Sequence, residues 1–177
     1  MVIISVGAIY QIYKFQTKVS SPDNNFQKNH KNMIISSSAF AAGQVIPDIY
    51  GCRGRDVNPP LETKEVPAKA KSLVLLVDDP DAPAGDWTHW LVWNISPQIT
   101  SIEADSIPLD GVIGLNDFGD NRYGGPCPPA GTHRYQFKVY ALDAILNLPT
   151  TTRKPELLPA MAGHILDQAI LIGTYSH

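Results

Sequence analysis

Two apolar runs in the middle of the chain predict neighbouring buried strands. Residues 72–77 (SLVLLV) form a continuous apolar run of strand length that ends in two aspartates, which is typical of a strand buried on both faces. Residues 89–95 (HWLVWNI) form a second run, and the eleven residues in between contain the Asp, Pro and Gly of a tight loop. We therefore expect two antiparallel neighbours, with residues 72–77 central in their sheet.

A third strand is predicted by alternation rather than by a continuous run. Residues 133–141 alternate between apolar and polar side chains, which indicates a strand that covers the core on one side only. The apolar set is Tyr135, Phe137 and Val139, and the polar set is Arg134, Gln136 and Lys138.

Near the C-terminus the spacing predicts a helix followed by a closing strand. After Pro155, a residue favoured in a first helical turn, apolar side chains recur at helical spacing. Pro159 would remove a hydrogen bond inside that helix, so we expect the helix to start near Leu158. Residues 169–175 (AILIGTY) then read as a strand. The helical set is Leu157, Leu158, Met161, Ile165 and Ala169.

These elements predict a mainly β protein, an antiparallel β-sandwich with a short C-terminal helical addition, and not an alternating α/β sheet. The 177 residues suit one domain with a real core. Lys and Arg total 14 against 17 acidic residues, so a large basic surface is missing and nucleic acid is excluded as a partner.

The start of the chain is predicted to be an extension. Residues 1–12 are apolar but too short to span a bilayer, and residues 14–32 are polar, as in a linker. We assign residues 1–32 as an anchor, an export remnant or an extended start, and residues 33–177 as the folded domain. The expected location is cytoplasmic, with export or membrane anchoring through residues 1–12 as the alternative.

Two loops could carry chemistry. Residues 78–83 (DDPDAP) place three carboxylates at the end of a buried strand; alone they suit a turn, but His89 starts the antiparallel return strand and should lie beside Asp79 and Asp81. Residues 124–131 (GGPCPPAG) have the glycines and prolines of a preformed pocket, and His133 follows them. Spacing alone does not show that the two loops converge.

Two finer expectations concern these loops. Arg134 lies on the other face of its strand from His133, so we expect it to be a structural ion-pair partner. Closely spaced prolines in tight binding loops favour cis bonds, so we also predict a cis X–Pro bond, for example at Ala82–Pro83.

Four blocks in series resemble the signature of the phosphatidylethanolamine-binding protein family. They are DPDAP (79–83), HW (89–90), YGGPCPP (123–129) and HRY (133–135). The match is closest to the prokaryotic Raf-kinase-inhibitor-like branch, and further blocks extend it over residues 34–175. One departure is Glu62-Thr63, where the branch usually has an aromatic residue.

The resemblance implies an antiparallel β-sandwich with a small pocket for phosphate, acetate or a phospholipid head group. It implies a non-enzymatic binding protein with no catalytic residue, metal ligand or cofactor. Inhibition of a protein kinase or a protease is also attached to the family. The implied pocket residues are Asp79, Asp81, Pro83, His89, Gly125, Pro126, Cys127, Pro128, His133 and Tyr135.

Several alternatives stay open. Cys52 and Cys127 match cysteine positions of the branch, which implies that they lie close together, as a disulfide in an exported protein or as thiols in a cytosolic one. A catalytic Cys127 paired with His133 ranks below both.

The rival function is a metal-dependent hydrolase that uses Asp79, Asp81, His89 and His133 as ligands. A purely structural interaction protein is a third reading. The oligomeric state is open, a homodimer included.

Overall fold

The computed structural model describes residues 32–177, which belong to one compact unit that begins at residue 31. Its strands are β1 (Ile34–Ser36), β2 (Leu61–Lys64), β3 (Ser72–Asp79), β4 (Trp87–Ile95), β5 (Ser101–Ile102), β6 (Val112–Ile113), β7 (Thr132–Leu142) and β8 (Ile165–Ser176). Its helices are a short 3₁₀ helix, η1 (Asp48–Tyr50), and one α-helix, α1 (Lys154–Met161).

The predicted extension, residues 1–32, lies almost wholly outside the described residues, so its boundary and the roles assigned to residues 1–12 stay predictions. Within residues 32–177, no helix combines the length and the apolar character that crossing a membrane would need.

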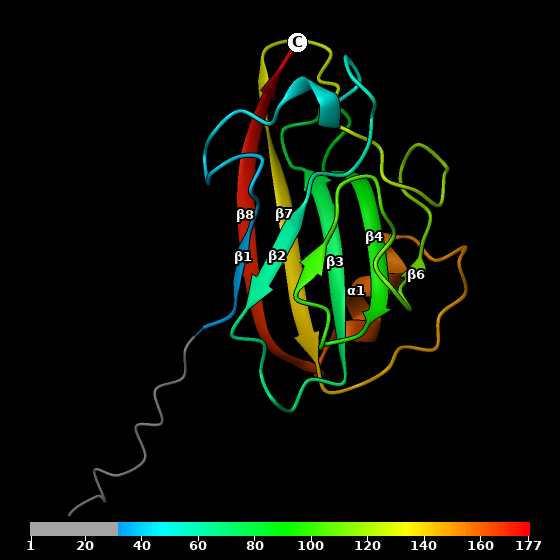
Figure 1. Cartoon of the computed structure of the whole chain (residues 1–177). Helices are drawn as coiled ribbons and strands as arrows, with labels where there is room; N and C mark the ends of the chain where they lie inside the picture. Colours follow the sequence, from blue (N-terminus) through cyan, green and yellow to red (C-terminus); the bar gives the residue numbers. More distant parts are fainter. Residues whose placement is uncertain (1–31) are drawn as a thin grey trace, which may run out of the picture. The chain divides into compact units, whose positions relative to one another are not determined.

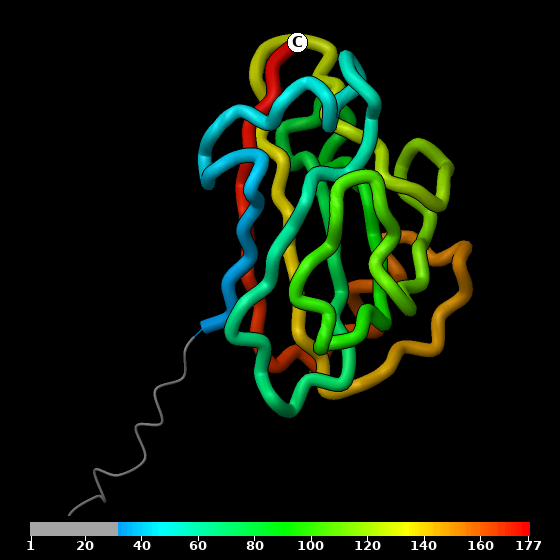
Figure 2. The backbone as a smooth tube through the Cα atoms, in the orientation of Figure 1, coloured from blue at the N-terminus to red at the C-terminus, as the bar shows by residue number. Residues whose placement is uncertain are grey.

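The strands form two sheets, as the sequence predicted. A five-stranded sheet has the order β6-β4-β3-β7-β8, and a three-stranded sheet has the order β1-β2-β5, with antiparallel neighbours throughout (Figure 1). β3 is central and β4 is its antiparallel neighbour, which confirms both expectations for the two apolar runs. β7 and β8 run side by side along their whole length (Figure 2).

The continuous apolar run of β3 is explained by two separate cores. Leu73, Leu75 and Val77 face the second sheet and join the larger core, whereas Val74 and Leu76 face the opposite side. On that opposite side the smaller core includes side chains of α1, which lies behind the five-stranded sheet in Figure 1. Because both faces are covered, β3 has no solvent-facing position.

The C-terminal helix is present, but its predicted bounds are wrong at both ends. It starts at Lys154 because the Arg153 backbone N–H donates to the Glu156 carboxylate at 3.0 Å, which closes the first turn ahead of Pro159. Ile165 and Ala169 belong to β8 instead of the helix. Gly163, with a φ of 82°, ends the helical path, and pairing with β7 along almost the whole of β8 then outweighs the helical spacing.

The predicted cis X–Pro bond is wrong, because every peptide bond among the described residues is trans. The loop after β3 closes through two ordinary turn contacts. The Asp81 N–H donates to Asp79 Oδ1 at 2.9 Å, and the Gly85 N–H donates to the Ala82 carbonyl at 2.9 Å. With the turn already closed, nothing opposes the usual trans preference.

Candidate functional site

A cavity of about 280 Å³ opens at the end of the sandwich where β3 ends and β4 and β7 begin. The antiparallel register places Asp79 opposite Trp87, and β7 enters beside β3 from the 124–131 loop. The cavity is lined by Asp79, Ala82, Pro83, Ala84, Trp87, His89, Phe118, Cys127, Pro128, Pro129, His133 and Tyr135. The two loops selected from the sequence therefore converge.

A β-bulge in β4 turns His89 toward this cavity. Val77 pairs with Trp90 and Asp78 pairs with Thr88, so His89 is the extra residue between two regular pairs. In regular alternation His89 and Trp90 would point to opposite faces. The bulge lets His89 line the cavity while Trp90 stays in the larger core, which is a common use of bulges near functional sites.

Asp79 orients His133. Its Oδ2 atom lies 2.7 Å from His133 Nδ1, and its Oδ1 atom accepts the Asp81 backbone N–H. Both side chains are buried. With Nδ1 engaged, Nε2 is the His133 nitrogen that remains for a ligand.

His89 is held by the opposite loop. Its Nδ1 atom lies 2.6 Å from the Gly124 carbonyl oxygen, so Nδ1 must carry the hydrogen, and Nε2 has no partner among residues 32–177. Burial lowers the His89 pKa, and it outweighs the Gly124 hydrogen bond and the nearby aspartates, which raise it. The imidazole is therefore neutral near pH ~7, and its Nε2 atom is an acceptor.

Tyr135 supplies a buried hydroxyl that lies close to the Asp79 carboxylate and the Cys127 backbone N–H but forms no hydrogen bond of normal geometry with any described residue. Its side chain is only 1% exposed and lines the cavity. Burial, followed by the Asp79 carboxylate, raises the pKa of Tyr135. The hydroxyl thus keeps its hydrogen and can donate it to a ligand.

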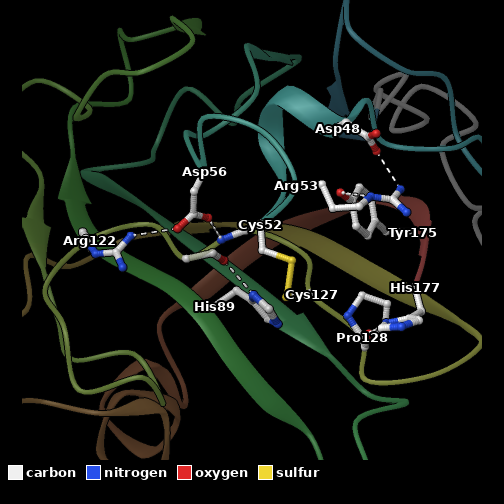
Figure 3. The surroundings of a disulfide bond; sticks show 12 residues. Asp48, Cys52, Arg53, Asp56, His89, Arg122, Cys127, Pro128, Tyr175 and His177 are labelled. Atoms are coloured by element: carbon white, nitrogen blue, oxygen red, sulfur yellow. Dashed lines mark hydrogen bonds and ion pairs between the residues drawn. A yellow bond between two sulfur atoms is a disulfide. The ribbon is translucent and has the colours of Figure 1, made fainter.

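The loop of residues 124–129, which forms another side of the cavity, is held in place by contacts with residue 52. Cys52 and Cys127 form a disulfide with Cα atoms 5.4 Å apart (Figure 3), and the Cys52 N–H donates to the Pro126 carbonyl at 3.0 Å. The disulfide alternative is the one that the structure contains. The catalytic-thiol alternative is wrong, because Cys127 has no free thiol.

The predicted pocket residues divide into lining and supporting positions. Asp79, Pro83, His89, Cys127, Pro128, His133 and Tyr135 line the cavity. Gly125 and Pro126 instead support the loop through backbone hydrogen bonds. Whether these residues bind a ligand stays a prediction.

Asp81 does not line the cavity, contrary to the prediction. The guanidinium of Arg134 binds its carboxylate with two contacts, at 2.8 and 2.6 Å, and these contacts lower the pKa of Asp81 to about 2. Two carboxylates near one anion would repel it, and the Arg134 guanidinium neutralises the charge of the Asp81 carboxylate. The predicted structural role of Arg134 is confirmed.

Sequence reasoning missed two aromatic lining residues, Trp87 and Phe118. Trp87 lies two positions before His89, which is a period that keeps both on one face of a strand. Phe118 belongs to residues 115–119 (LNDFG), one of the further blocks that resemble the family, and its ring packs edge-on against His89 with centroids 5.4 Å apart. The two-residue spacing of Trp87 and the family segment around Phe118 could therefore have indicated both residues from the sequence.

The metal-hydrolase alternative required four converging ligands. Asp81 is engaged by Arg134, and residues 32–177 contain no group of three or more His, Cys, Asp or Glu side chains placed to hold a metal ion.

A second, larger cavity of about 420 Å³ shares none of the lining residues of the first. Its charged groups neutralise one another, as Asp56 pairs with Arg122 and Asp105 pairs with Arg55.

Comparison with known proteins identifies the family. The family model described as "Phosphatidylethanolamine-binding protein" matches residues 36–176. The chain belongs to this family. A UPF0098 protein of Methanothermobacter thermautotrophicus is 47% identical over 148 residues, which cover 81% of this chain and 98% of that protein.

Two solved structures of the phosphatidylethanolamine-binding protein family agree. A putative homologue from Chlamydia trachomatis has a TM-score of 0.80 at 44% identity and covers 82% of this chain and 98% of its own. YbcL of E. coli, described as a member of the mammalian family, has a TM-score of 0.78 at 29% identity and covers 83% and 99%. Family and fold are therefore as the sequence predicted, and membership supports a binding protein of this fold.

Proposed function

We propose that the cavity binds the phosphate group of a small anion, such as a phospholipid head group, a phosphorylated metabolite or a phosphorylated side chain. The observation that carries the proposal is the Tyr135 hydroxyl, a buried donor without a well-formed hydrogen bond among residues 32–177 in a cavity large enough for a ligand. Leaving a buried donor poorly paired costs up to about 1–3 kcal/mol. An anion oxygen would recover that cost.

The two imidazoles set the protonation of the complex. His89 offers an acceptor at Nε2, so a phosphate oxygen that faces it must carry a hydrogen, or His89 must take up a proton. The dianion of a phosphate monoester therefore binds with uptake of one proton, whereas hydrogenphosphate already carries the required hydrogen. His133, oriented by Asp79, can supply a second charge-assisted hydrogen bond.

The test is calorimetric titration of inorganic phosphate and phosphoethanolamine at pH ~8 and pH ~6, with and without a chelator. Affinity for phosphoethanolamine should rise on acidification by about tenfold per coupled proton, and affinity for inorganic phosphate should rise less. His89→Ala and His133→Ala should each flatten that dependence. Affinity that falls toward pH ~6, or that disappears with the chelator, would overturn the proposal.

Tyr135→Phe separates ligand binding from scaffold effects, because it removes one oxygen that lacks a well-formed hydrogen bond within the described residues. We expect phosphate affinity to fall about tenfold at both pH values, since a hydrogen bond to a charged group contributes about 1.5–3 kcal/mol. Thermal stability should be unchanged or higher. Unchanged affinity would remove the main support for the proposal.

A further inference from the structure

One peptide group connects Asp56, outside the cavity lining, to His89 inside it. The Gly125 N–H donates to Asp56 Oδ1 at 2.5 Å, and the Gly124 carbonyl of the same peptide accepts the His89 Nδ1–H at 2.6 Å. Figure 3 shows this chain of two hydrogen bonds. Because a peptide is planar and rigid, the direction of one bond fixes the direction of the other.

Glycine is required here by close approach. A Cβ atom on Gly125 would lie 2.3 Å from the Tyr50 carbonyl oxygen and 2.7 Å from Asp56 Oδ1. The same two glycines make the peptide easy to rotate, because neither residue has a side chain that restricts its backbone. A flipped peptide would direct its N–H at His89 and its carbonyl at Asp56.

We propose that Asp56 is a positioning residue that prevents this flip and so holds His89 in the tautomer with the hydrogen on Nδ1 and an acceptor at Nε2. A carboxylate attracts the Gly125 N–H and would repel the Gly124 carbonyl, so it favours only one orientation. In the flipped state Nδ1 would become the acceptor and Nε2 the donor.

The consequence for ligands rests on the proposed function. With Nε2 as an acceptor, the cavity suits a phosphate monoester, whose monoanion carries a P–OH hydrogen. A phosphodiester has no such hydrogen and would require protonated His89. Asp56 would therefore favour monoesters and inorganic phosphate over diesters.

Other charged and titratable groups also act on His89, so each Asp56 variant needs a control that removes a similar charge elsewhere. Asp78 and Asp79 approach it from β3, and His133 and Tyr135 line the cavity from β7. Asp56 contributes from the loop before β2, and its negative charge raises the His89 pKa against the dominant effect of burial.

The chain supplies a close control for Asp56. Asp56 and Asp105 both have a φ of 56°, both line the larger cavity and both pair with an arginine. Only Asp56 bonds the Gly124–Gly125 peptide. Replacing either residue with glycine removes a carboxylate without backbone strain, because glycine tolerates positive φ. Asp56→Asn keeps an acceptor oxygen but replaces the charge with an NH₂ donor, which can pair with the Gly124 carbonyl of a flipped peptide.

The experiment is ¹⁵N NMR of the His89 ring nitrogens in the full chain without ligand, assigned with a His89→Gln variant. The unmodified protein and Asp105→Gly should show hydrogen on Nδ1. Asp56→Gly should change the tautomer ratio at least tenfold toward hydrogen on Nε2. Asp56→Asn should shift the ratio in the same direction by a smaller factor, because its amide can pair with either orientation of the peptide.

An unchanged tautomer in Asp56→Gly would overturn the proposal, whatever that variant does to stability. If Asp56→Gly does not fold, an unchanged tautomer ratio in Asp56→Asn overturns it instead. Phenyl phosphate, a monoester, should bind more tightly than dimethyl phosphate, a diester. Titration with both compounds keeps the two proposals apart. Absence of any phosphate binding together with the expected tautomer change refutes the ligand assignment and leaves the role of Asp56 intact.

Discussion

Asp78 and Asp79 are adjacent in β3, both are buried, and they serve opposite sides of the same sheet. Asp78 Oδ2 lies 2.7 Å from Lys138 Nζ and 2.6 Å from Lys154 Nζ, on the side of α1. Asp79 lies on the cavity side and bonds His133. One carboxylate has two lysine ammonium groups as partners, and the other has an imidazole.

A buried carboxylate can stabilise the fold through ion pairs, or it can orient a side chain at a cavity. Burial alone would lower the Lys154 pKa, but hydrogen bonds to Asp78 and Asp86 raise it, so Lys154 keeps its charge and ties the start of α1 to the sheet. Asp79 instead orients an imidazole at the cavity. We therefore assign Asp78 to stability and Asp79 to the site.

The largest expected effect is on stability, from Asp78→Asn. It leaves Lys138 and Lys154 without their shared counter-charge in a mostly buried position. Breaking a buried pair in this way costs about 3–5 kcal/mol, and we expect the lower end because Lys154 keeps Asp86. Urea unfolding measures the loss. Phosphate affinity of the folded variant should not change, and a loss similar to that of Asp79→Asn would contradict the comparison.

The matched variant Asp79→Asn should act mainly on binding. A neutral amide is a weaker hydrogen-bond acceptor than a carboxylate, so it orients the His133 ring less firmly. We expect phosphate affinity to fall about tenfold, or about 1.4 kcal/mol. Calorimetry measures this. Unchanged affinity would mean that Asp79 does not act on the ligand through His133.

The smallest effect belongs to the pair beside the site, Asp81 and Arg134. Arg134→Gln should cost no more than about 1 kcal/mol, because the side chain of Arg134 is 57% exposed. The Asp81 pKa is depressed from 3.8 to about 2, so this contribution is complete above the higher value and is lost as the pH falls through the lower one. Unfolding at neutral and at acidic pH checks the trend. A large loss of phosphate affinity would return Asp81 to the site.

Much of the fold followed from local patterns. The continuous run of β3, the alternation of β7 and the turn residues between β3 and β4 are properties of short segments, and side-chain period reports burial directly. The same logic placed His89 at the end of the sheet where Asp79 lies. The family blocks then added His133 and Tyr135, and the exposed face of β7 assigned Arg134 correctly.

The tertiary structure decided how those groups are used. Whether Asp81 faces the cavity depends on Arg134, and the tautomer of His89 depends on a peptide 35 positions away along the chain. The bulge that turns His89 inward exists only as a register shift between β3 and β4. Asp56 is the clearest case, because its hydrogen bond to Gly125 spans 69 positions. Local periodicity records which face of an element is buried, but it carries no information about which distant donor or acceptor completes a polar group.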